Sequence, residues 1–326
     1  MSSTPNLTEQ FYDLAPVKRI ERWLTAMPHP PLVVDIAATH VAAARWGKIN
    51  GALDSFYVEP LTLGSVMPSP VEMNVAQPDA VKSALRRVFD HVPAREHGVV
   101  LLIPDLVVRV FILPFDALPR NANDALPLLR WRLKKSVPFD VDETVVSWMR
   151  QAGNTGNLEV VTAVARQRII REYEEIVEGL NAKVGVVLSS TLATLPLIEA
   201  HGATLMIRMS GKTMTTVIVR GGSLCVYRST DMASDAALLS PQAMLDEIFP
   251  AMAYYQDTWG GAVDWVRLAG FGAREAIFRS ALSEELKCSV GSLAESQEVL
   301  GLDSSAKDLL KQNLEGLVGW MRNGGS

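Results

Sequence analysis

Side chains suited to catalysis or metal binding are thinly spread along this sequence of 326 residues. Its five histidines and two cysteines, Cys225 and Cys288, form neither a Cys-x-x-Cys nor a His-Glu-x-x-His spacing. We therefore expect no zinc site and no disulfide framework. No Ser/His/Asp set and no carboxylate pair is arranged for catalysis, so we predict no catalytic residue. His40 and His201 are interpreted as surface or turn residues.

Three turns become a candidate anion-binding site only through the family resemblance that is given below. Asp35 ends an apolar strand, residues 210–212 read Ser-Gly-Lys between two strands, and residues 270–272 read Gly-Phe-Gly after another. Glycine favours such a site because a Cβ blocks the approach of a phosphate, and an acidic side chain can position Mg²⁺. Each turn also has a structural interpretation, since acids often cap turns and glycines often join a strand to a helix.

A basic stretch, residues 126–142 (LPLLRWRLKKSVPFDVD), is a second candidate site. Leu126, Leu129 and Leu133 recur as one apolar helical stripe, which we expect to begin at an Asn123/Asp124 cap and to end at Pro138. Arginines and lysines crowd its second half, where cations suit a helix C-terminus.

Composition limits the classes of function. The chain is 48% hydrophobic and 21% charged, which is enough for a core divided between two domains. A net charge of −5 argues against binding to nucleic acid. The N-terminus lacks the apolar core of a signal peptide, and no apolar run reaches the length of a membrane span. We expect a cytosolic protein.

The predicted elements fall into two similar halves. Each half opens with a three-stranded meander, at residues 32–36, 41–46 and 53–58 and at residues 205–209, 213–220 and 224–228. Further strands are predicted at residues 99–103, 144–149, 158–165, 184–188 and 263–268, and another contains Val108, Phe111 and Leu113. Helices are predicted at residues 17–27, 79–92, 167–180, 192–199, 240–258, 276–286 and 309–321. The pattern indicates a duplicated α/β architecture.

The order of elements and several phrases resemble the type IV pilus assembly protein PilM family, relatives of the cell-division protein FtsA. Residues 33–46 (VVDIAATHVAAARW) stand where PilM has its first phosphate loop. Residues 129–148 resemble its helix followed by a Pro-Phe phrase, and residues 247–273 resemble its Tyr-Tyr helix, strand and glycine turn. The resemblance implies an actin-like (ribonuclease H-like) α/β fold with two lobes and an inserted 1C-type subdomain. It divides the chain into an N-terminal extension (1–30), a first lobe (31–102 and 166–203), the insertion (103–165) and a second lobe (204–326).

The resemblance also implies where ATP and Mg²⁺ would bind, and there the sequence departs from the family. Asp35 matches the first acid, but the turn after it lacks glycine. Arg208 replaces the acid of the second loop, unless it faces solvent as an ordinary strand residue, and Leu188 replaces another acid. We expect a degraded site without ATPase activity. If a nucleotide binds, the candidate residues are Asp35, Thr39, Ser210, Gly211, Lys212, Gly270 and Gly272.

For function, the resemblance implies a cytoplasmic scaffold held at the inner membrane through its partners. It would bind the N-terminal tail of a PilN-like membrane protein and contact the pilus motor ATPase complex, with self-association as a further option. An apolar groove with a charged rim suits such a tail. The candidate groove residues are Leu126, Leu129, Arg130, Leu133, Val137 and Phe139, which could equally form the core of their own subdomain. Two alternatives stay open, an ATP-regulated switch and an actin-like enzyme such as a sugar kinase.

Overall fold

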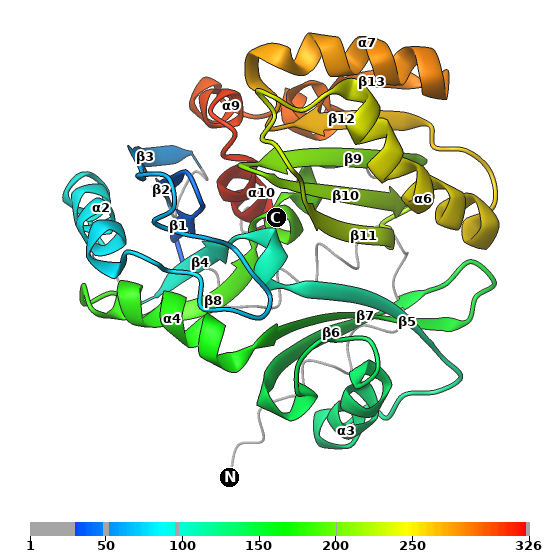
Figure 1. Cartoon of the computed structure of the whole chain (residues 1–326), viewed down its shortest axis with the longest axis horizontal. Helices are drawn as coiled ribbons and strands as arrows, with labels where there is room; N and C mark the ends of the chain where they lie inside the picture. Colours follow the sequence, from blue (N-terminus) through cyan, green and yellow to red (C-terminus); the bar gives the residue numbers. More distant parts are fainter. Residues whose placement is uncertain (1–29, 48–51, 95–97, 200, 324–326) are drawn as a thin grey trace.

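Two five-stranded sheets with the same topology form the body of the protein (Figure 1). The computed structural model describes residues 30–47, 52–94, 98–199 and 201–323, so the predicted helix at residues 17–27 lies outside the described residues. The first sheet has the order β3-β2-β1-β4-β8, from β1 (Leu32–Ile36), β2 (His40–Trp46), β3 (Leu53–Pro60), β4 (Val99–Ile103) and β8 (Val184–Ser189). The second has the order β11-β10-β9-β12-β13, from β9 (Ala203–Ser210), β10 (Thr213–Arg220), β11 (Ser223–Asp231), β12 (Trp265–Ala269) and β13 (Ser289–Ser292).

Each sheet is an antiparallel meander extended by two parallel strands. In the first sheet β1 pairs with β2 antiparallel and with β4 parallel, and β4 pairs with β8 parallel. In the second, β9 takes the place of β1, with β10 antiparallel and β12 parallel beside it. The repeated topology confirms the predicted duplicated α/β architecture. The short strand β13 was not predicted, because its four residues include two serines and a glycine.

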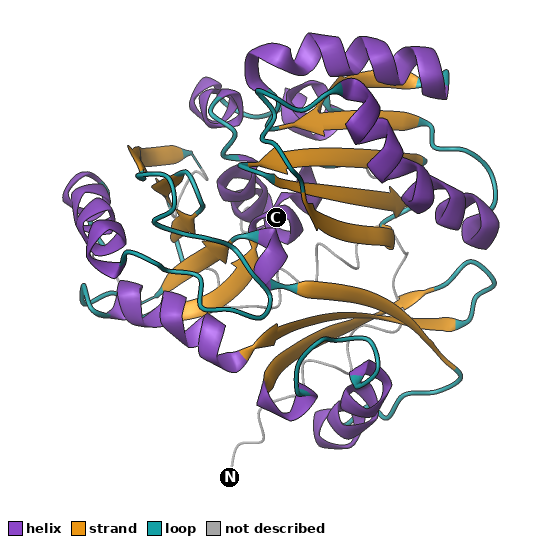
Figure 2. Cartoon of the chain, in the orientation of Figure 1, coloured by secondary structure: helices purple, strands orange, loops and turns teal. Residues whose placement is uncertain are grey.

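Helices cover the outer face of each sheet and also fill the space between the sheets (Figure 2). Helices α2 (Pro78–His91) and α4 (Gln167–Glu178) cover the first sheet, and α6 (Pro241–Trp259) and α7 (Glu275–Leu286) cover the second. Strand side chains alternate between the two layers, so Val34 packs outward while Val33 packs inward. The inner layer is completed by α5 (Ser190–Thr194), α8 (Gln297–Leu300), α9 (Ser304–Lys311) and α10 (Glu315–Asn323).

A third, three-stranded antiparallel sheet is inserted in the chain between β4 and β8. Its order is β5-β7-β6, from β5 (Arg109–Phe115), β6 (Thr144–Ala152) and β7 (Leu158–Arg166), and α3 (Ala122–Leu133) packs against it. Both β5 and β6 are therefore edge strands. The predicted boundaries of the lobes and of the inserted subdomain stay predictions, because sheet membership alone does not fix where a domain ends.

Two helix predictions are wrong in detail. Helix α3 is capped by Asn121, whose side chain accepts a hydrogen bond from the backbone of Asn123, and it ends at Leu133 before Pro138 is reached. The predicted C-terminal helix at residues 309–321 is two helices, α9 and α10, separated at Asn313 in the left-handed region (φ +60°). Among the described residues, no helix combines the length and the apolar character needed to cross a membrane.

Candidate functional site

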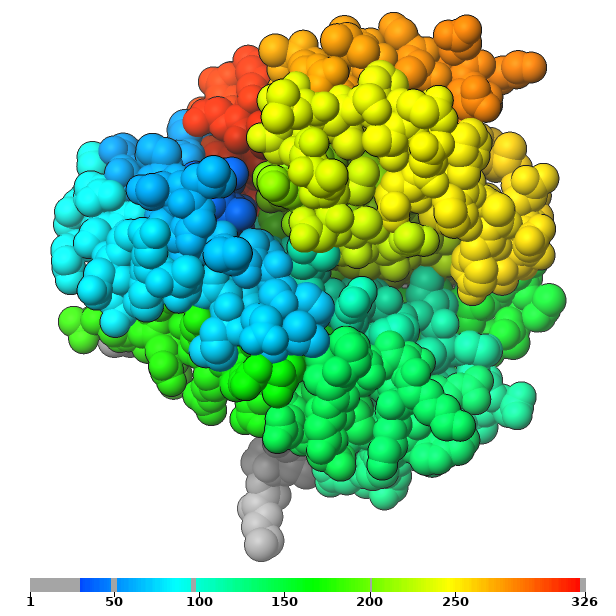
Figure 3. All heavy atoms as spheres, viewed as in Figure 1, coloured from blue at the N-terminus to red at the C-terminus, as the bar shows by residue number. Residues whose placement is uncertain are grey.

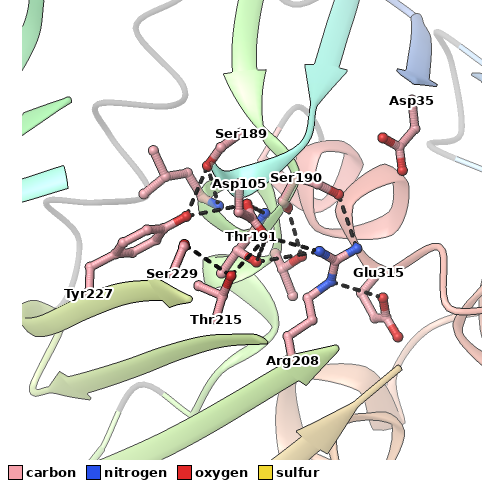
Figure 4. A network of polar contacts seen from close by, with 12 residues as sticks. Asp35, Asp105, Ser189, Ser190, Thr191, Arg208, Thr215, Tyr227, Ser229 and Glu315 are labelled. Atoms are coloured by element: carbon pink, nitrogen blue, oxygen red, sulfur yellow. Dashed lines mark hydrogen bonds and ion pairs between the residues drawn. The ribbon is translucent and has the colours of Figure 1, made fainter. Parts of the chain in front are cut away.

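Arg208 lies at the centre of a buried polar network between the sheets (Figure 4). It stands near the end of β9 and is only 3% exposed, so the interpretation of Arg208 as a solvent-facing residue is wrong. Its Nη1 donates to Asp105 Oδ2 at 3.2 Å, and its Nε donates to Glu315 Oε2 at 3.3 Å. Nη2 donates to Ser190 Oγ at 3.1 Å. Because Nη1 also donates to Thr191 Oγ1 at 3.4 Å, the buried guanidinium binds two carboxylates and two hydroxyls.

Asp105 is the second centre of the network. It opens the 3₁₀ turn Asp105–Val107 that leads from β4 to β5 and is 2% exposed. Its Oδ1 accepts the backbone N–H of Thr191 at 2.8 Å, and its Oδ2 accepts the hydroxyls of Thr191 at 2.6 Å and Thr215 at 3.1 Å. The Tyr227 hydroxyl donates to Oδ1 at 3.3 Å. Hydrogen bonds therefore compensate both oxygens for the loss of water.

Burial and charge act in opposite directions on the ionisable groups. Burial opposes the charged form of Arg208, but Glu315, Asp105 and Asp35 outweigh it and raise its pKa above the ordinary value. Burial raises the pKa of Glu315 against the opposing effect of Arg208. Burial and the charge of Asp105 raise the pKa of Tyr227 well above its usual value, so its hydroxyl keeps the proton that it donates.

The network joins parts of the fold that are far apart in sequence. Asp105 lies where the first sheet leads into the three-stranded sheet, and Glu315 begins α10. Helix α5, which follows β8, contributes Ser190 and Thr191. The second sheet contributes one residue from each of three strands: Arg208, Thr215 and Tyr227. We name the set the inter-sheet clamp; it comprises Asp105, Ser190, Thr191, Arg208, Thr215, Tyr227 and Glu315. Of these residues, the sequence analysis singled out Arg208. An acid two residues after the end of the apolar strand β4 was the available signal for Asp105.

The predicted phosphate-binding turns lie beside the clamp and close to each other. Asp35 on β1 is 2% exposed, its Oδ2 lies 3.7 Å from His40 Nε2, and its Oδ1 has no hydrogen-bond partner among the described residues. His40 is half-buried rather than a surface residue, and its Nδ1 lies 3.0 Å from the Thr39 hydroxyl. A Cβ added to Gly211 would stand 3.7 Å from the Cβ of Ala38 and 3.8 Å from Cγ2 of Thr39. The two turns are thus separated by about the width of one methyl group.

The other predicted nucleotide residues have different surroundings. Ser210 is half-buried, and Lys212 is exposed in the β9–β10 turn. Gly270 has φ +79°, and a Cβ there would overlap the carbonyl oxygen of Met209, so its glycine allows the end of β12 to pack on β9. Gly272 has φ +52° with open space around it. Among the described residues, no three His, Cys, Asp or Glu side chains are grouped as a metal site.

The predicted partner groove on α3 is wrong for its two central residues. Leu129 and Leu133 are fully buried against the three-stranded sheet, so neither can contact a partner. Val137 and Phe139 pack on the same core, and Leu126 is half-buried. Arg130 donates to the carbonyl of Thr144 at 3.3 Å. The apolar stripe of α3 serves its own subdomain, which was the competing interpretation.

Two grooves do border the three-stranded sheet. The first, which we name the β6–β7 groove, has a volume of about 90 Å³ and lies between that sheet, β8 and α5; an adjoining space shares Ser147, Ala163 and Leu192 with it. Val145 lies on it and is 46% exposed. The second, the β5–β11 groove, has a volume of about 440 Å³ and lies between the edge strands of two different sheets, below the yellow region of Figure 3.

Comparison with known proteins identifies the fold. No protein-family model and no curated protein matches the sequence. A solved PilM–PilN type IV pilus biogenesis complex is similar over 92% of this chain and 100% of that chain, with a TM-score of 0.74 and 17% identity. Weaker likenesses include the cytoplasmic domain of EpsL, an inner membrane component of the type II secretion system of Vibrio cholerae (TM-score 0.45, 13% identity, 73% of this chain and 80% of that chain). Another is a protein of actin-like ATPase fold and unknown function from Bacteroides thetaiotaomicron, with a TM-score of 0.47 and 11% identity over 90% of this chain and 97% of that chain. The chain has a PilM-like fold, as the sequence predicted.

Proposed function

We propose that this chain is a PilM-like cytoplasmic scaffold of a type IV pilus or related secretion platform, which binds the cytoplasmic tail of a PilN-like membrane protein. The observation that carries the proposal is the likeness in fold, over 92% of the chain, to a protein solved in a PilM–PilN complex. The chain is then held at the inner membrane through its partners. Contact with a motor ATPase complex and self-association stay predictions.

The β6–β7 groove is the place that we propose for the tail. Its walls are almost entirely apolar, and small side chains such as Ser147 and Ala163 leave space along the sheet. Because β6 is an edge strand, its backbone can pair with an extended segment while the groove receives alternate side chains. An apolar floor beside an open strand edge suits a short peptide better than a folded domain.

The proposed scaffold works without ATP, because the residues around the two turns fit Mg²⁺ and phosphates poorly. A guanidinium stands where the second acid is expected, and a cation repels Mg²⁺. The carboxylates of Asp105 and Glu315 are already bound to Arg208. The approach of Ala38 and Thr39 to Gly211 leaves little room for a phosphate between the turns. We therefore propose a degraded nucleotide site and no ATPase activity.

Binding of a labelled peptide, the N-terminal cytoplasmic tail of the PilN-like protein from the same organism, tests the proposal. Fluorescence anisotropy should give saturable binding to the full chain, unchanged by ATP with Mg²⁺. Ser147→Trp fills the groove and Val145→Lys adds a charge at its mouth, so each should weaken binding by about tenfold or more. Ser136 is exposed and lies on the other groove, so Ser136→Trp is the matched control and should leave the affinity for the tail peptide unchanged.

Two results would contradict this proposal. Tail binding that survives both groove substitutions would place the tail elsewhere. Binding that appears only with ATP and Mg²⁺ would favour the alternative, a nucleotide-dependent switch.

A further inference from the structure

The β5–β11 groove, with a volume of about 440 Å³, is a cavity that the proposed function leaves without a role. Residues 108–112 and residues 225–229 line it as two unbroken runs, one along β5 and one along β11. Side chains alternate between the faces of a strand, so a cavity lined by every successive residue lies along the strand edges rather than on one face. Both strands are edge strands of their sheets. Each of the two strands therefore has a neighbouring strand on one side only in its described sheet.

Each edge is blocked outside the groove. On β5, Pro114 lies beyond the groove and has no N–H to offer a further strand. On β11, the side-chain amide of Gln151 forms two hydrogen bonds with the backbone of Leu224. Its Nε2 donates to the Leu224 carbonyl at 2.7 Å, and its Oε1 accepts the Leu224 N–H at 3.0 Å. Native edges are commonly protected against strand pairing in such ways. Both of these protecting features lie outside the runs of β5 and β11 that line the groove.

The rim of the groove is cationic and aromatic. Among the described residues that line it, two are arginines and none is acidic. Arg109 is exposed, and Arg228 is 48% exposed with one ion pair, to Glu247 at 2.8 Å. Ser136, also on the rim, follows the exposed Lys134 and Lys135. Tyr254 stands at the rim with 53% of its surface exposed, although a large aromatic side chain is usually buried.

We propose that the β5–β11 groove binds an extended, acidic segment of a partner protein by strand addition. The partner backbone pairs with an open strand edge, its alternate apolar side chains contact the half-buried residues of β5, and its carboxylates meet Arg109 and Arg228. A run of about five residues at roughly 3.3 Å per residue sets the length of the segment. This second site is separate from the β6–β7 groove, so a scaffold can hold two partners at once.

Peptide display against the full chain tests the proposal. One library alternates apolar residues with Asp or Glu over about six positions, and a matched library carries Lys or Arg at the same positions. We expect enrichment from the acidic library only. The affinity of an enriched peptide should fall by about tenfold or more in Ser136→Trp and in Arg109→Glu. Both side chains are exposed, so unchanged melting temperatures should accompany the loss.

Two controls decide the mode and the place of binding. N-methylation of alternate peptide residues removes the N–H groups needed for strand pairing and should abolish binding, whereas Ser147→Trp, in the other groove, should leave it unchanged. Equal enrichment from both libraries, or indifference to N-methylation, would overturn the proposal. The proposal would also be overturned if the enriched peptides no longer bound to Ser147→Trp but still bound to Ser136→Trp. So would a dimer of the free chain that Ser136→Trp converts to a monomer, since a second copy would then fill the groove.

Discussion

Replacing Arg208 with methionine should destabilise the chain by about 3–5 kcal/mol. The side chain is 3% exposed and binds Asp105 and Glu315, which are themselves almost completely buried. Methionine keeps most of the volume but leaves two buried carboxylates without a counter-charge. Removing one partner of a buried ion pair is far more costly than replacing the whole cluster, because the remaining charge stays desolvated.

The magnitude can be followed by thermal and urea unfolding. With an unfolding entropy of about 2.1 cal/mol/K per residue, 326 residues give about 0.7 kcal/mol/K, so the melting temperature should fall by about 4–7 °C. Arg208→Lys keeps the charge but loses the planar fork that reaches both carboxylates, and should recover about half of the loss. Arg87→Met, which breaks a surface pair with Glu59 at 51% exposure, should cost less than about 1 kcal/mol.

A third variant separates charge from packing. Arg208→Met combined with Asp105→Asn and Glu315→Gln removes all three charges and should regain much of the lost stability, as a neutral cluster has no uncompensated carboxylate. Two results would refute this reasoning. Either Arg208→Met alone is as stable as the wild type, or the triple variant is no more stable than Arg208→Met. In both cases the ion pairs do not hold the clamp together.

Three further predictions concern the same region. Burial raises the pKa of Glu315 in the folded chain above its ordinary value of 4.5. Protonation of Glu315 therefore contributes to the free energy of unfolding; the contribution is fully present below pH 4.5 and is lost as the pH rises through the higher folded-state pKa. Urea unfolding should therefore show Glu315→Gln gaining stability relative to the wild type with rising pH, by at most about 1.4 kcal/mol per pH unit; a flat difference contradicts this. Millimolar ATP with Mg²⁺ should leave the melting temperature unchanged, and an increase abolished by Asp35→Ala would restore the nucleotide site. Gln151→Ala leaves the backbone of Leu224 unpaired and should cost about 1–3 kcal/mol in urea unfolding, with faster amide exchange in β11; unchanged exchange would exclude the role of Gln151 as an edge cap.

Sequence patterns predicted the fold well because most elements carry strong local signals. Strands such as β1, β4 and β10 are unbroken apolar runs or meander strands bounded by turn residues, and their predicted limits agree with the structure. The division of α9 from α10 could not be predicted, since Asn313 sits inside a continuous apolar pattern and only tertiary packing selects its left-handed conformation. Amphipathic helices at the chain end usually lie on a surface, whereas here Trp320 is 1% exposed between the two sheets.

The site was less predictable because it depends on contacts across long separations in sequence. Arg208 and Asp105 are 103 residues apart, and Arg208 and Glu315 are 107 apart. A charged residue within a strand is locally indistinguishable from an exposed one, so its burial became evident only with its partners in place. The stripe on α3 had the same ambiguity, because periodicity identifies an apolar face without identifying what covers it.

The position of the clamp between the two sheets indicates a mechanical role. Two packed parts of a protein can move relative to each other, and a buried ion pair between them opposes that motion. Here Asp105 ties the start of the three-stranded sheet to Arg208 and Tyr227 of the second sheet, while Gln151 ties its far edge to Leu224. The β6–β7 groove lies where the three-stranded sheet meets the first sheet, and the β5–β11 groove where it meets the second. We expect these contacts to keep both grooves at a constant width, which would suit the proposed binding of extended segments without a nucleotide cycle.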